Sequence, residues 1–580
     1  MIWFIDNPLR FLHEREEMQK LETGVDWFNH VWKFNSGSIE LDFNMKIYDQ
    51  TFAGTLTYPS LFPVTPAFIT PRDSNEQWSH HQYGSGGSLC LEWRSDNWRQ
   101  EITGADLIKS AHKLLLTEKQ PDTASSVPSA HLLTQGQNLR NKWLRFVATN
   151  DLIIQGNNYK TPIKRAIKTS NIFKKNSLVM FVSAVSDHEG AMQNISDIPA
   201  GFTDEWSFGS FKDEGYWYQH EFFDTAHEIK STEDLETLLI RSGFSTEDIV
   251  VHSSVPDKYA SRVLIIQGTD QHSLRVFRIS AIEELTLNEV QLILPSPKED
   301  RLPLNFNQFE NIKVGIVGLG SIGSKVAVSL VRSGIKNFLL IDDDYLEVGN
   351  LVRHELSFTD VGRNKVDAVA NAMHLIGSEL KIATDTTRIH GQESSMKMAS
   401  CLKEVTNCDI LIDATANPNV FLIVASLAKK EKTPIFWAEV FAGGCGGVIA
   451  RAHPNFDSNP FAIRDGFNKY LMDLPPAPLK QTTGYDVTDG KPAVAFDCDV
   501  TFIASALTGL IIDSIDVETP NKFSYPIYLI GMSKEWDFVG PFDTRPINID
   551  GENWDDTSEA HTAEDMVAVL STIKTIIDND

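Results

Sequence analysis

The chain has 580 residues, and its composition excludes several classes of protein. Hydrophobic residues make up 42% and charged residues 22%, as in folded soluble proteins, and the length predicts about three domains. The net charge of -26 argues against nucleic-acid binding, because an acidic surface repels phosphate. Five cysteines without a C-x-x-C spacing predict a reducing cytoplasm rather than a disulfide framework or a zinc site. No apolar run reaches the roughly 20 residues that span a bilayer, so no membrane association is expected.

Residues 1–120 have the pattern of a small α+β domain. Residues 9–21 have the spacing of a charged amphipathic helix, and a Pro-rich stretch precedes a second helical pattern at 107–117. Between the first helix and the Pro-rich stretch, apolar and polar residues alternate as in an antiparallel sheet with one exposed face, in the segments 27–35, 38–47 and 51–58.

Residues 121–300 predict a mixed linker domain with a supporting or docking role, since they contain no catalytic constellation. The stretch TASSVPSAHLLTQGQ has the composition of a linker. Three runs resemble strands: LRFVATNDLII, SLVMFVSAV and SRVLIIQGT. An acidic, aromatic stretch, TDEWSFGSFKDEGYWYQHEF, lies between the last two runs.

Residues 301–580 alternate between strand and helix patterns, which predicts a doubly wound, mostly parallel, Rossmann-like sheet. The whole chain is therefore expected to be an α/β multidomain protein. The predicted strands are IKVGIVG, NFLLIDDD, DILIDAT, TPIFWAEVF and GGVIARAHP, and the predicted helices are 321–333, 365–376 and 421–430. The apolar segment 502–512 predicts a buried helix, and 559–577 contains an amphipathic one.

The motif GLGSIG follows a predicted strand and opens a predicted helix, which indicates a site for a nucleotide. Gly318 permits the tight turn, Gly320 lets phosphate approach the backbone, and Gly323 lets the helix pack on the strand. The first N–H groups of the helix supply donors for an anion. Alone, the motif does not say which nucleotide binds.

Five polar residues that follow the next strand favour ATP over a nicotinamide cofactor. Asp342 and Asp344 end that strand, where an acidic residue can accept hydrogen bonds from ribose. Asn350, Arg353 and Lys365 follow closely. Two cations and an amide serve a reaction at phosphate, because the cations can stabilise charge that develops at the α-phosphate.

The region 300–540 resembles the adenylating domain of ubiquitin-activating enzymes and of their bacterial ThiF/MoeB relatives. The family's glycine loop, acidic pair, N-x-x-R and G-x-x-K elements all occur here in order, as Gly318/Gly320/Gly323, Asp342/Asp344, Asn350/Arg353 and Gly362/Lys365. The resemblance implies adenylation of a carboxylate with ATP and Mg²⁺. It assigns ATP binding to the glycines and to Asp342, Asp344, Asn350, Asp413 and Asn417, and catalysis to Arg353 and Lys365.

One position departs from the family pattern. The family's D-C-T-D-N reads Asp413-Ala414-Thr415-Ala416-Asn417, so the second acid, which lies near Mg²⁺ in the family, is missing. Asp413 or Asp344 can take its place, or ATP binds more weakly, so the metal ligands remain unknown. The family's paired-cysteine zinc knuckle is absent from the sequence as well.

Cys498 stands where the family has a thioester-forming cysteine, in a crossover loop before a late helix. Asp497 and Asp499 flank it and disfavour a thiolate, so activation of this thiol must come from elsewhere. Cys401 and Cys408 are predicted to be buried core thiols, and Cys445, among small residues in a predicted strand, is predicted to occupy a tightly packed backbone position.

Most of residues 1–120 resemble ubiquitin-conjugating enzymes. The Pro-rich stretch, the G-x-x-C-L pattern around Cys90 and the downstream Trp98 carry this resemblance. It implies that Cys90 is the thioester-carrying, catalytic cysteine. The family's His-Pro-Asn becomes His80-His81-Gln82, so Gln82 or a histidine would replace the oxyanion-stabilising Asn.

The combination of the two domains resembles the activating–conjugating fusions of bacterial CBASS anti-phage operons. It implies a thioester relay that starts on the C-terminal glycine of a CD-NTase, a cGAS-like nucleotidyltransferase, and passes from Cys498 to Cys90 and then to an unidentified target amine. It also implies a homodimer and a middle domain related to an inactive adenylation domain. Two alternatives stay open: an NAD-dependent oxidoreductase, and a non-catalytic scaffold derived from an activating enzyme.

Overall fold

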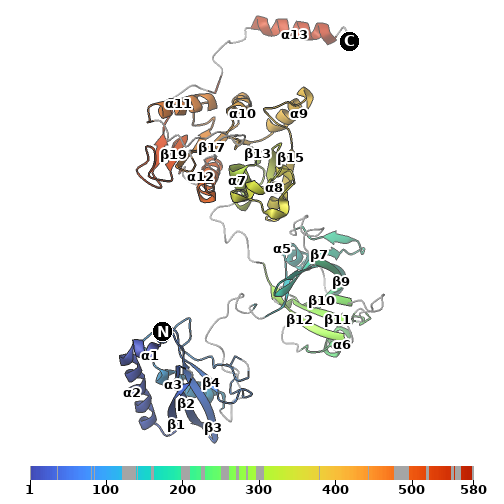
Figure 1. Cartoon of the computed structure of the whole chain (residues 1–580). Coiled ribbons are helices and arrows are strands. Elements are labelled where there is room, and N and C mark those ends of the chain that lie inside the picture. The colour runs from blue at the N-terminus through green and yellow to red at the C-terminus, as the bar shows by residue number, and fades with distance from the viewer. Residues whose placement is uncertain are drawn as a thin grey trace. The chain divides into compact units, whose positions relative to one another are not determined.

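The computed structural model divides the chain into two compact units, Met1–Asn138 and Leu139–Asp580. Each folded part is described by itself (Figure 1). The described residues are 2–35, 37–79, 81–83, 85–119, 139, 142–157, 162–196, 210–223, 229–247, 249, 260–269, 273–281, 285–295, 306–377, 379–441, 443–475, 495–516, 522–549, 554–555 and 563–577. The predicted linker at 123–137 and His80 lie outside these ranges.

The N-terminal unit has the predicted order of helix, antiparallel sheet and helix. Its four strands pair in chain order, and every neighbouring pair is antiparallel. The alternating residues Leu41, Phe43 and Met45 are buried under the helices, while their neighbours face outward. The elements are α1 Trp3–Asp6, α2 Pro8–Gly24, β1 Phe28–Asn35, β2 Ser38–Ile47, β3 Gln50–Tyr58, β4 Phe68–Pro71 and α3 Gly104–Glu118.

A buried carboxylate ties the helices of this unit to its sheet. Glu14 of α2 accepts hydrogen bonds from Tyr58 Oη at 2.9 Å and from the Gly104 N–H at 2.7 Å. Arg10 Nη2 lies 2.7 Å from its other oxygen. Burial raises the pKa of Glu14, and the bond from Gly104 and the charge of Arg10 oppose that rise. The carboxylate thereby fixes α2, β3 and the start of α3 together.

The middle part is a ring of strands. Seven of its eight strands close on themselves, because β5 pairs with both β12 and β7. Helix α6 packs its apolar face on the ring through Leu235, Leu238 and Leu239. The elements are β5 Leu144–Val147, α5 Asn150–Asn157, β6 Ile163–Lys174, β7 Ser177–Ser186, β8 Met192–Asn194, β9 Ser210–Gln219, α6 Thr232–Arg241, β10 Ala260–Gln267, β11 Arg275–Ala281 and β12 Leu285–Ile293.

The strand predictions for this part are partly correct. SLVMFVSAV and SRVLIIQGT form β7 and β10, but only the first four residues of LRFVATNDLII form a strand. Its last five residues lie in α5, where the Thr149 hydroxyl, just before the helix, accepts a hydrogen bond from the Leu152 N–H in the first turn. The acidic, aromatic stretch contains β9, which the sequence pattern did not predict.

The topology of the middle part differs from a doubly wound sheet. Its neighbouring pairs β12–β11, β11–β10, β9–β6 and β6–β7 are antiparallel, whereas a doubly wound sheet has parallel neighbours. The predicted relation to an inactive adenylation domain gains no support from this arrangement and stays a prediction.

The C-terminal part contains the expected Rossmann-like sheet with an antiparallel extension. The order is β15-β14-β13-β16-β17-β18-β19-β20. Strands β15 to β17 are parallel, as predicted, while β18, β19 and β20 continue the sheet antiparallel. The strands are β13 Lys313–Val317, β14 Asn337–Ile341, β15 Lys381–Asp385, β16 Ile410–Asp413, β17 Ile435–Phe441, β18 Gly446–Ala452, β19 Ile527–Gly531 and β20 Thr544–Ile547.

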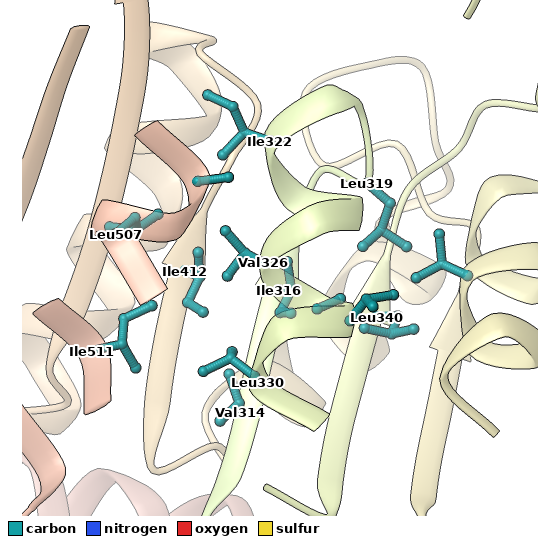
Figure 2. Packing of buried hydrophobic residues seen from close by; sticks show 14 of the residues in the cluster. Val314, Ile316, Leu319, Ile322, Val326, Leu330, Leu340, Ile412, Leu507 and Ile511 are labelled. Atoms are coloured by element: carbon teal, nitrogen blue, oxygen red, sulfur yellow. The ribbon is translucent and has the colours of Figure 1, made fainter. Parts of the chain in front are cut away.

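Helices cover both faces of this sheet. On β14, Phe338 and Leu340 face one core, and Leu339 and Ile341 face the other. The first face carries α7 Ser321–Arg332, α8 Lys365–His374 and α12 Asp497–Ile515, and the second carries α9 Ser395–Val405, α10 Pro418–Glu431 and α11 Pro460–Met472. Figure 2 shows side chains of α7, α12 and the strands meeting in the first core.

Helix α12 contains the predicted buried segment 502–512. Among the described residues it is the one helix long and apolar enough to cross a membrane. Val500, Ile503, Leu507 and Ile511 are nevertheless buried in the core against the sheet and α7, which is the position of a core helix. The terminal helix α13 Ala563–Ile577 confirms the helix predicted near the end of the chain.

Truncation of Leu507 to Ala is expected to destabilise the C-terminal part by about 3 kcal/mol, because its fully buried side chain would leave a cavity. Urea denaturation, with hydrogen exchange of α7 and α12 peptides read by mass spectrometry, measures this loss separately from the other parts. Leu422→Ala, at a 52% exposed position on α10, is the matched control. Equal losses for both variants would contradict the described core.

Candidate active site

The glycine loop joins β13 to α7 with backbone geometry that explains two of its glycines. Gly318 has φ +86°, which favours glycine, and a Cβ there would meet Thr415 Cγ2 at 2.8 Å. A Cβ on Gly323 would lie 1.9 Å from the carbonyl oxygen of Gly318. The predicted roles of these residues, a tight turn and close packing of helix on strand, therefore match the structure.

The third glycine borders open space at the start of α7. No atom of the described chain lies within 4 Å of a Cβ built on Gly320. Gly320 is the N-cap of α7 and no side chain caps this helix, so its first N–H groups face the loop without a side-chain acceptor. This arrangement fits a phosphate group, since it offers N–H donors, the positive end of the helix dipole and room for an anion.

Two buried side chains hold the backbone of Leu319 inside the loop. The Leu319 N–H donates to Asp342 Oδ2 at 2.6 Å, and the Leu319 carbonyl lies 2.8 Å from His354 Nε2. His354 Nδ1 accepts from the Leu356 N–H at 3.2 Å, and burial lowers the pKa of His354. The ring is therefore neutral, with its proton on Nε2, and donates to Leu319. Sequence reasoning missed His354, whose one signal is its place directly after Arg353.

Because His354 is anchored on the glycine loop, its neighbour Arg353 is held beside the same loop. Burial lowers the pKa of Arg353. Asn350 lies one turn earlier in the 3-10 helix Val348–Val352, and its Oδ1 accepts from the Glu347 N–H at 3.0 Å. This pair of predicted residues is therefore part of one short, internally braced segment.

Lys365 and the acidic pair also come together as predicted. Asp342 Oδ1 accepts from the Asp344 N–H at 2.9 Å. The Lys365 N–H donates to the Asp344 carbonyl at 3.0 Å, and Lys365 Nζ contacts Asp344 Oδ2. Both oxygens of Asp342 thus bind backbone donors of the site itself, a bracing function that the sequence did not predict. Burial raises the pKa of Asp342, and its bond from Leu319 opposes that rise.

The motif that departs from the family pattern, residues 413–417, forms a turn directly after β16. Asp413 Oδ1 accepts from Thr415 Oγ1 at 2.6 Å and from the Thr415 N–H at 3.0 Å, and burial raises the pKa of Asp413. Asn417 caps α10 by accepting from the Asn419 N–H at 2.9 Å. Ala416 has φ +52°, a left-handed conformation in which Asp and Asn are enriched. The backbone therefore retains a geometry suited to the acid that is missing.

A charged pair that sequence reasoning missed lies at the next strand. Glu439 is on β17, parallel to β16, and its Oε1 lies 3.1 Å from Arg464 Nη2 of α11. The charge of Arg464 lowers the pKa of Asp413, and the charge of Glu439 raises it. Among the described residues no group of three His, Cys, Asp or Glu side chains is placed to hold a metal ion. A carboxylate of this edge can still supply one ligand to a Mg²⁺ that is bound mainly by phosphate and water.

Cys498 lies in the first turn of α12 rather than in a loop before the helix. It is exposed, and its Sγ lies 3.7 Å from Asp499 Oδ1. The preceding residue, Asp497, forms an ion pair with Lys325 of α7 at 2.9 Å. Lys325 lies two residues after the glycine loop. The ion pair therefore holds the start of α12, where Cys498 lies, beside the N-terminal end of α7.

The other three thiols of this part are buried, as expected. Burial raises the pKa of Cys401 to about 12 and that of Cys408 to about 11. Cys445 lies in the turn before β18 and not within a strand, but it is 2% exposed. None of the three offers an accessible nucleophile.

Cys90 is partly exposed in the N-terminal unit, and its N–H donates to the His81 carbonyl at 2.6 Å. Gln82, a predicted substitute for the missing Asn, is used within its own loop. Its Oε1 accepts from the Trp78 N–H at 2.8 Å, and its Nε2 donates to the Glu76 carbonyl at 3.1 Å. The sequence also missed Arg94, whose Nη1 lies 2.8 Å from Cys90 Sγ.

Gly323→Ala is expected to destabilise the glycine loop by about 2 kcal/mol, because the added methyl group would meet backbone and α7 would have to move away. The shift of the thermal unfolding midpoint measures this cost. Gly349→Ala is the matched control, since a Cβ at Gly349 has no neighbour within 4 Å in the described chain. An unchanged midpoint for Gly323→Ala would show that the loop packs differently.

The C-terminal part of the chain is similar to known proteins. Residues 299–484 match the model of the ThiF family. The chain is 29% identical over 170 residues to an ATP-dependent ubiquitin transferase-like protein, Cap2, of Enterobacter hormaechei, a match covering 29% of this chain and 27% of Cap2. It is 31% identical over 119 residues to ubiquitin-like modifier-activating enzyme 5 of Aedes aegypti, covering 19% of this chain and 30% of that enzyme.

Among solved structures, Escherichia coli MccB with ATP is similar with a TM-score of 0.33 and 22% identity, covering 43% of this chain and 66% of MccB. The matches to Cap2 and to the mosquito enzyme span less than a third of the length of those relatives. The family match itself covers the glycine loop, the acidic pair, Arg353, Lys365 and the turn at Asp413. Residues 299–484 are a ThiF-family domain.

Proposed function

We propose that the chain is an ATP-dependent enzyme that adenylates the C-terminal carboxylate of a protein and passes the acyl group to Cys498, then to Cys90, and finally to an amine. One observation carries the first step: a braced glycine loop at the uncapped N-terminus of α7, with Arg353 and Lys365 on segments fixed to it. The ThiF match and the similarity to Cap2 support this proposal.

In the adenylation step, a carboxylate oxygen attacks the α-phosphate of ATP, and the bond to the β-phosphate breaks to release pyrophosphate. The N-terminus of α7 binds phosphate, and Arg353 and Lys365 balance the charge that develops during attack. Lys365 contacts Asp344 in the structure, so its ammonium group is already directed to the acidic edge. Asp344 or Asp413 would supply the carboxylate for Mg²⁺.

In the second step, the Cys498 thiolate attacks the acyl carbon, a C–S bond forms and AMP leaves. Exposure of Cys498 makes it accessible, and the Lys325–Asp497 pair holds it near the glycine loop. Transfer to Cys90 exchanges one thioester for another, and attack by an amine then yields an amide. The conjugating activity of the N-terminal unit is proposed from its G-x-x-C-L motif and from its order of helix, four-stranded sheet and helix.

For the substrate, we propose a CD-NTase with a C-terminal glycine, in the setting of CBASS anti-phage defence. The resemblance of the two-domain combination to the fusions of CBASS operons suggests this choice, and the similarity to Cap2, a ubiquitin transferase-like protein, supports a protein substrate. A homodimer in the cytoplasm, without nucleic-acid or membrane partners, is part of the same proposal, and the acceptor amine is unidentified.

Lys365→Ala is expected to lower ATP–pyrophosphate exchange about 100-fold, because a preorganised cation at the reacting phosphate would be lost. The exchange is measured with a CD-NTase from the same operon and Mg²⁺. Lys381→Ala, at an exposed position on β15, is the matched control and is expected to retain full exchange. If Lys365→Ala exchanged pyrophosphate as fast as the wild type, Lys365 would have no function in adenylation.

The relay predicts distinct adducts for the two thiol variants. Wild type, Cys498→Ala and Cys90→Ala are each mixed with ATP, Mg²⁺ and the CD-NTase, then examined by non-reducing gel and intact mass. A thiol-sensitive adduct is expected on the wild type, none on Cys498→Ala, and one confined to Cys498 on Cys90→Ala. The CD-NTase without its final glycine is the control. An adduct on Cys90 in the Cys498→Ala variant would contradict the order of transfer.

A non-catalytic scaffold derived from an activating enzyme is the second candidate. Ala416, in place of an acid at a left-handed position, favours it. Binding of ATP without any pyrophosphate exchange, in the wild type and with the CD-NTase present, would decide for the scaffold.

A further inference from the structure

The surroundings of Cys90 contain a cation that no family motif accounts for. Arg94 Nη1 lies 2.8 Å from Cys90 Sγ, within hydrogen-bonding distance for sulfur. The Arg94 side chain is 18% exposed, so water screens this contact only in part. A cation against a cysteine sulfur favours the thiolate, which is the nucleophilic form.

The loop around Arg94 is braced at several points, which fixes the guanidinium. The Arg94 N–H donates to Asn97 Oδ1 at 2.8 Å, and Asn97 Nδ2 donates to the Glu92 carbonyl at 2.7 Å. The Glu92 N–H donates to Ser110 Oγ of α3 at 3.0 Å, and Trp98 Nε1 donates to the Pro63 carbonyl at 2.8 Å. The loop is thus attached to α3 and to the Pro-rich segment. The guanidinium is therefore held in position before negative charge develops on sulfur, and the loop does not have to reorganise.

Other groups near Cys90 are engaged elsewhere. The Gln82 amide bonds to the backbone of Trp78 and Glu76, as described above. His81 Nε2 lies 4.0 Å from Glu118 Oε1. Among the described side chains, Arg94 is therefore the one with a charged donor directed at the sulfur.

We propose that Arg94 is a catalytic residue that stabilises negative charge on Cys90 Sγ during acyl transfer; this inference rests on the proposed conjugating function of Cys90. In loading, the thiolate attacks the acyl carbon of the donor thioester, the new C–S bond forms and the donor sulfur leaves as a thiolate. In discharge, an amine attacks the same carbon, its proton passes to water, and Cys90 leaves as a thiolate. Arg94 stabilises the negative sulfur at the start of the first step and at the end of the second.

The charged and titratable groups that face Arg94 are consistent with this function. They are Cys90, Asp96, whose Oδ1 lies 3.5 Å from Arg94 Nε, and Tyr83. Burial lowers the pKa of Arg94, but its bond to Cys90 and the nearby acids raise it, so the guanidinium stays charged. Asp96 is exposed at its carboxylate end, so it neutralises the guanidinium only partly.

The test measures the rate at which iodoacetamide alkylates Cys90 in the full chain, as a function of pH. A Cys498→Ala background removes the exposed competing thiol, and mass spectrometry of the Cys90 peptide gives the rate. Arg94→Gln is expected to be alkylated about tenfold more slowly at pH 7, because the cation that stabilises the nucleophilic sulfur is lost.

Two further variants separate charge from structure. Arg94→Lys keeps the charge without the planar fork and is expected to restore part of the rate. Arg99→Gln, at an exposed position of the same segment, is the matched control and should behave as the background protein. Equal alkylation of Arg94→Gln and the background protein at every pH would overturn the inference.

The alkylation requires neither ATP nor a substrate, so its outcome is separate from that of the relay. If Arg94→Gln slows alkylation but wild-type Cys90 forms no acyl adduct, the function of Arg94 is supported and the proposed relay is contradicted. If the wild type forms the adduct but Arg94→Gln does not slow alkylation, the relay is supported and the function of Arg94 is contradicted.

Discussion

The arrangement of the candidate site depends on two hydrogen bonds to the backbone of one residue, Leu319. Asp342 binds its N–H and His354 binds its carbonyl, and all three residues are largely or fully buried. A buried carboxylate is costly unless backbone donors satisfy it, and the N–H groups of Leu319 and Asp344 do so. The same two bonds join β14 and the segment of Arg353 to the glycine loop, so together they position the backbone proposed to bind phosphate and the cation beside it.

The sequence predicted the glycine loop from its position between a strand and a helix, whereas the acidic pair and Lys365 were indicated by their order in the motif of a resembling family. It did not predict His354, since a single histidine beside an arginine has no periodic or spacing signal. Nor did it predict the antiparallel direction of β18, whose existence it did predict, or the strands β19 and β20. A strand buried on both faces has the same apolar pattern whichever direction its neighbour runs, so the sequence of GGVIARAHP carries no information on that direction.

The middle part shows a second limit of sequence patterns. Polar side chains occupy buried positions on its strands, where Asp213 accepts from Ser261 Oγ at 2.7 Å and from Asn171 Nδ2 at 3.1 Å, with Arg278 Nη2 at 3.6 Å. Because these residues are inside the fold, the apolar alternation that identifies a strand is interrupted in β6 and β9. Asp213 contacts side chains on three other strands, and such pairing becomes visible only when the strands are placed together.

The two thiols of the proposed relay lie in opposite electrostatic surroundings, and this difference bears on the direction of transfer. Cys498 is flanked by carboxylates, whereas Cys90 contacts a guanidinium. A stabilised thiolate is the better leaving group, so an acyl group on Cys90 is the more reactive of the two thioesters. Exchange between the thiols alone would then favour acyl-Cys498. In the proposed relay, net transfer would require an amine that consumes acyl-Cys90 irreversibly, and in the absence of that amine the acyl group would remain mainly on Cys498.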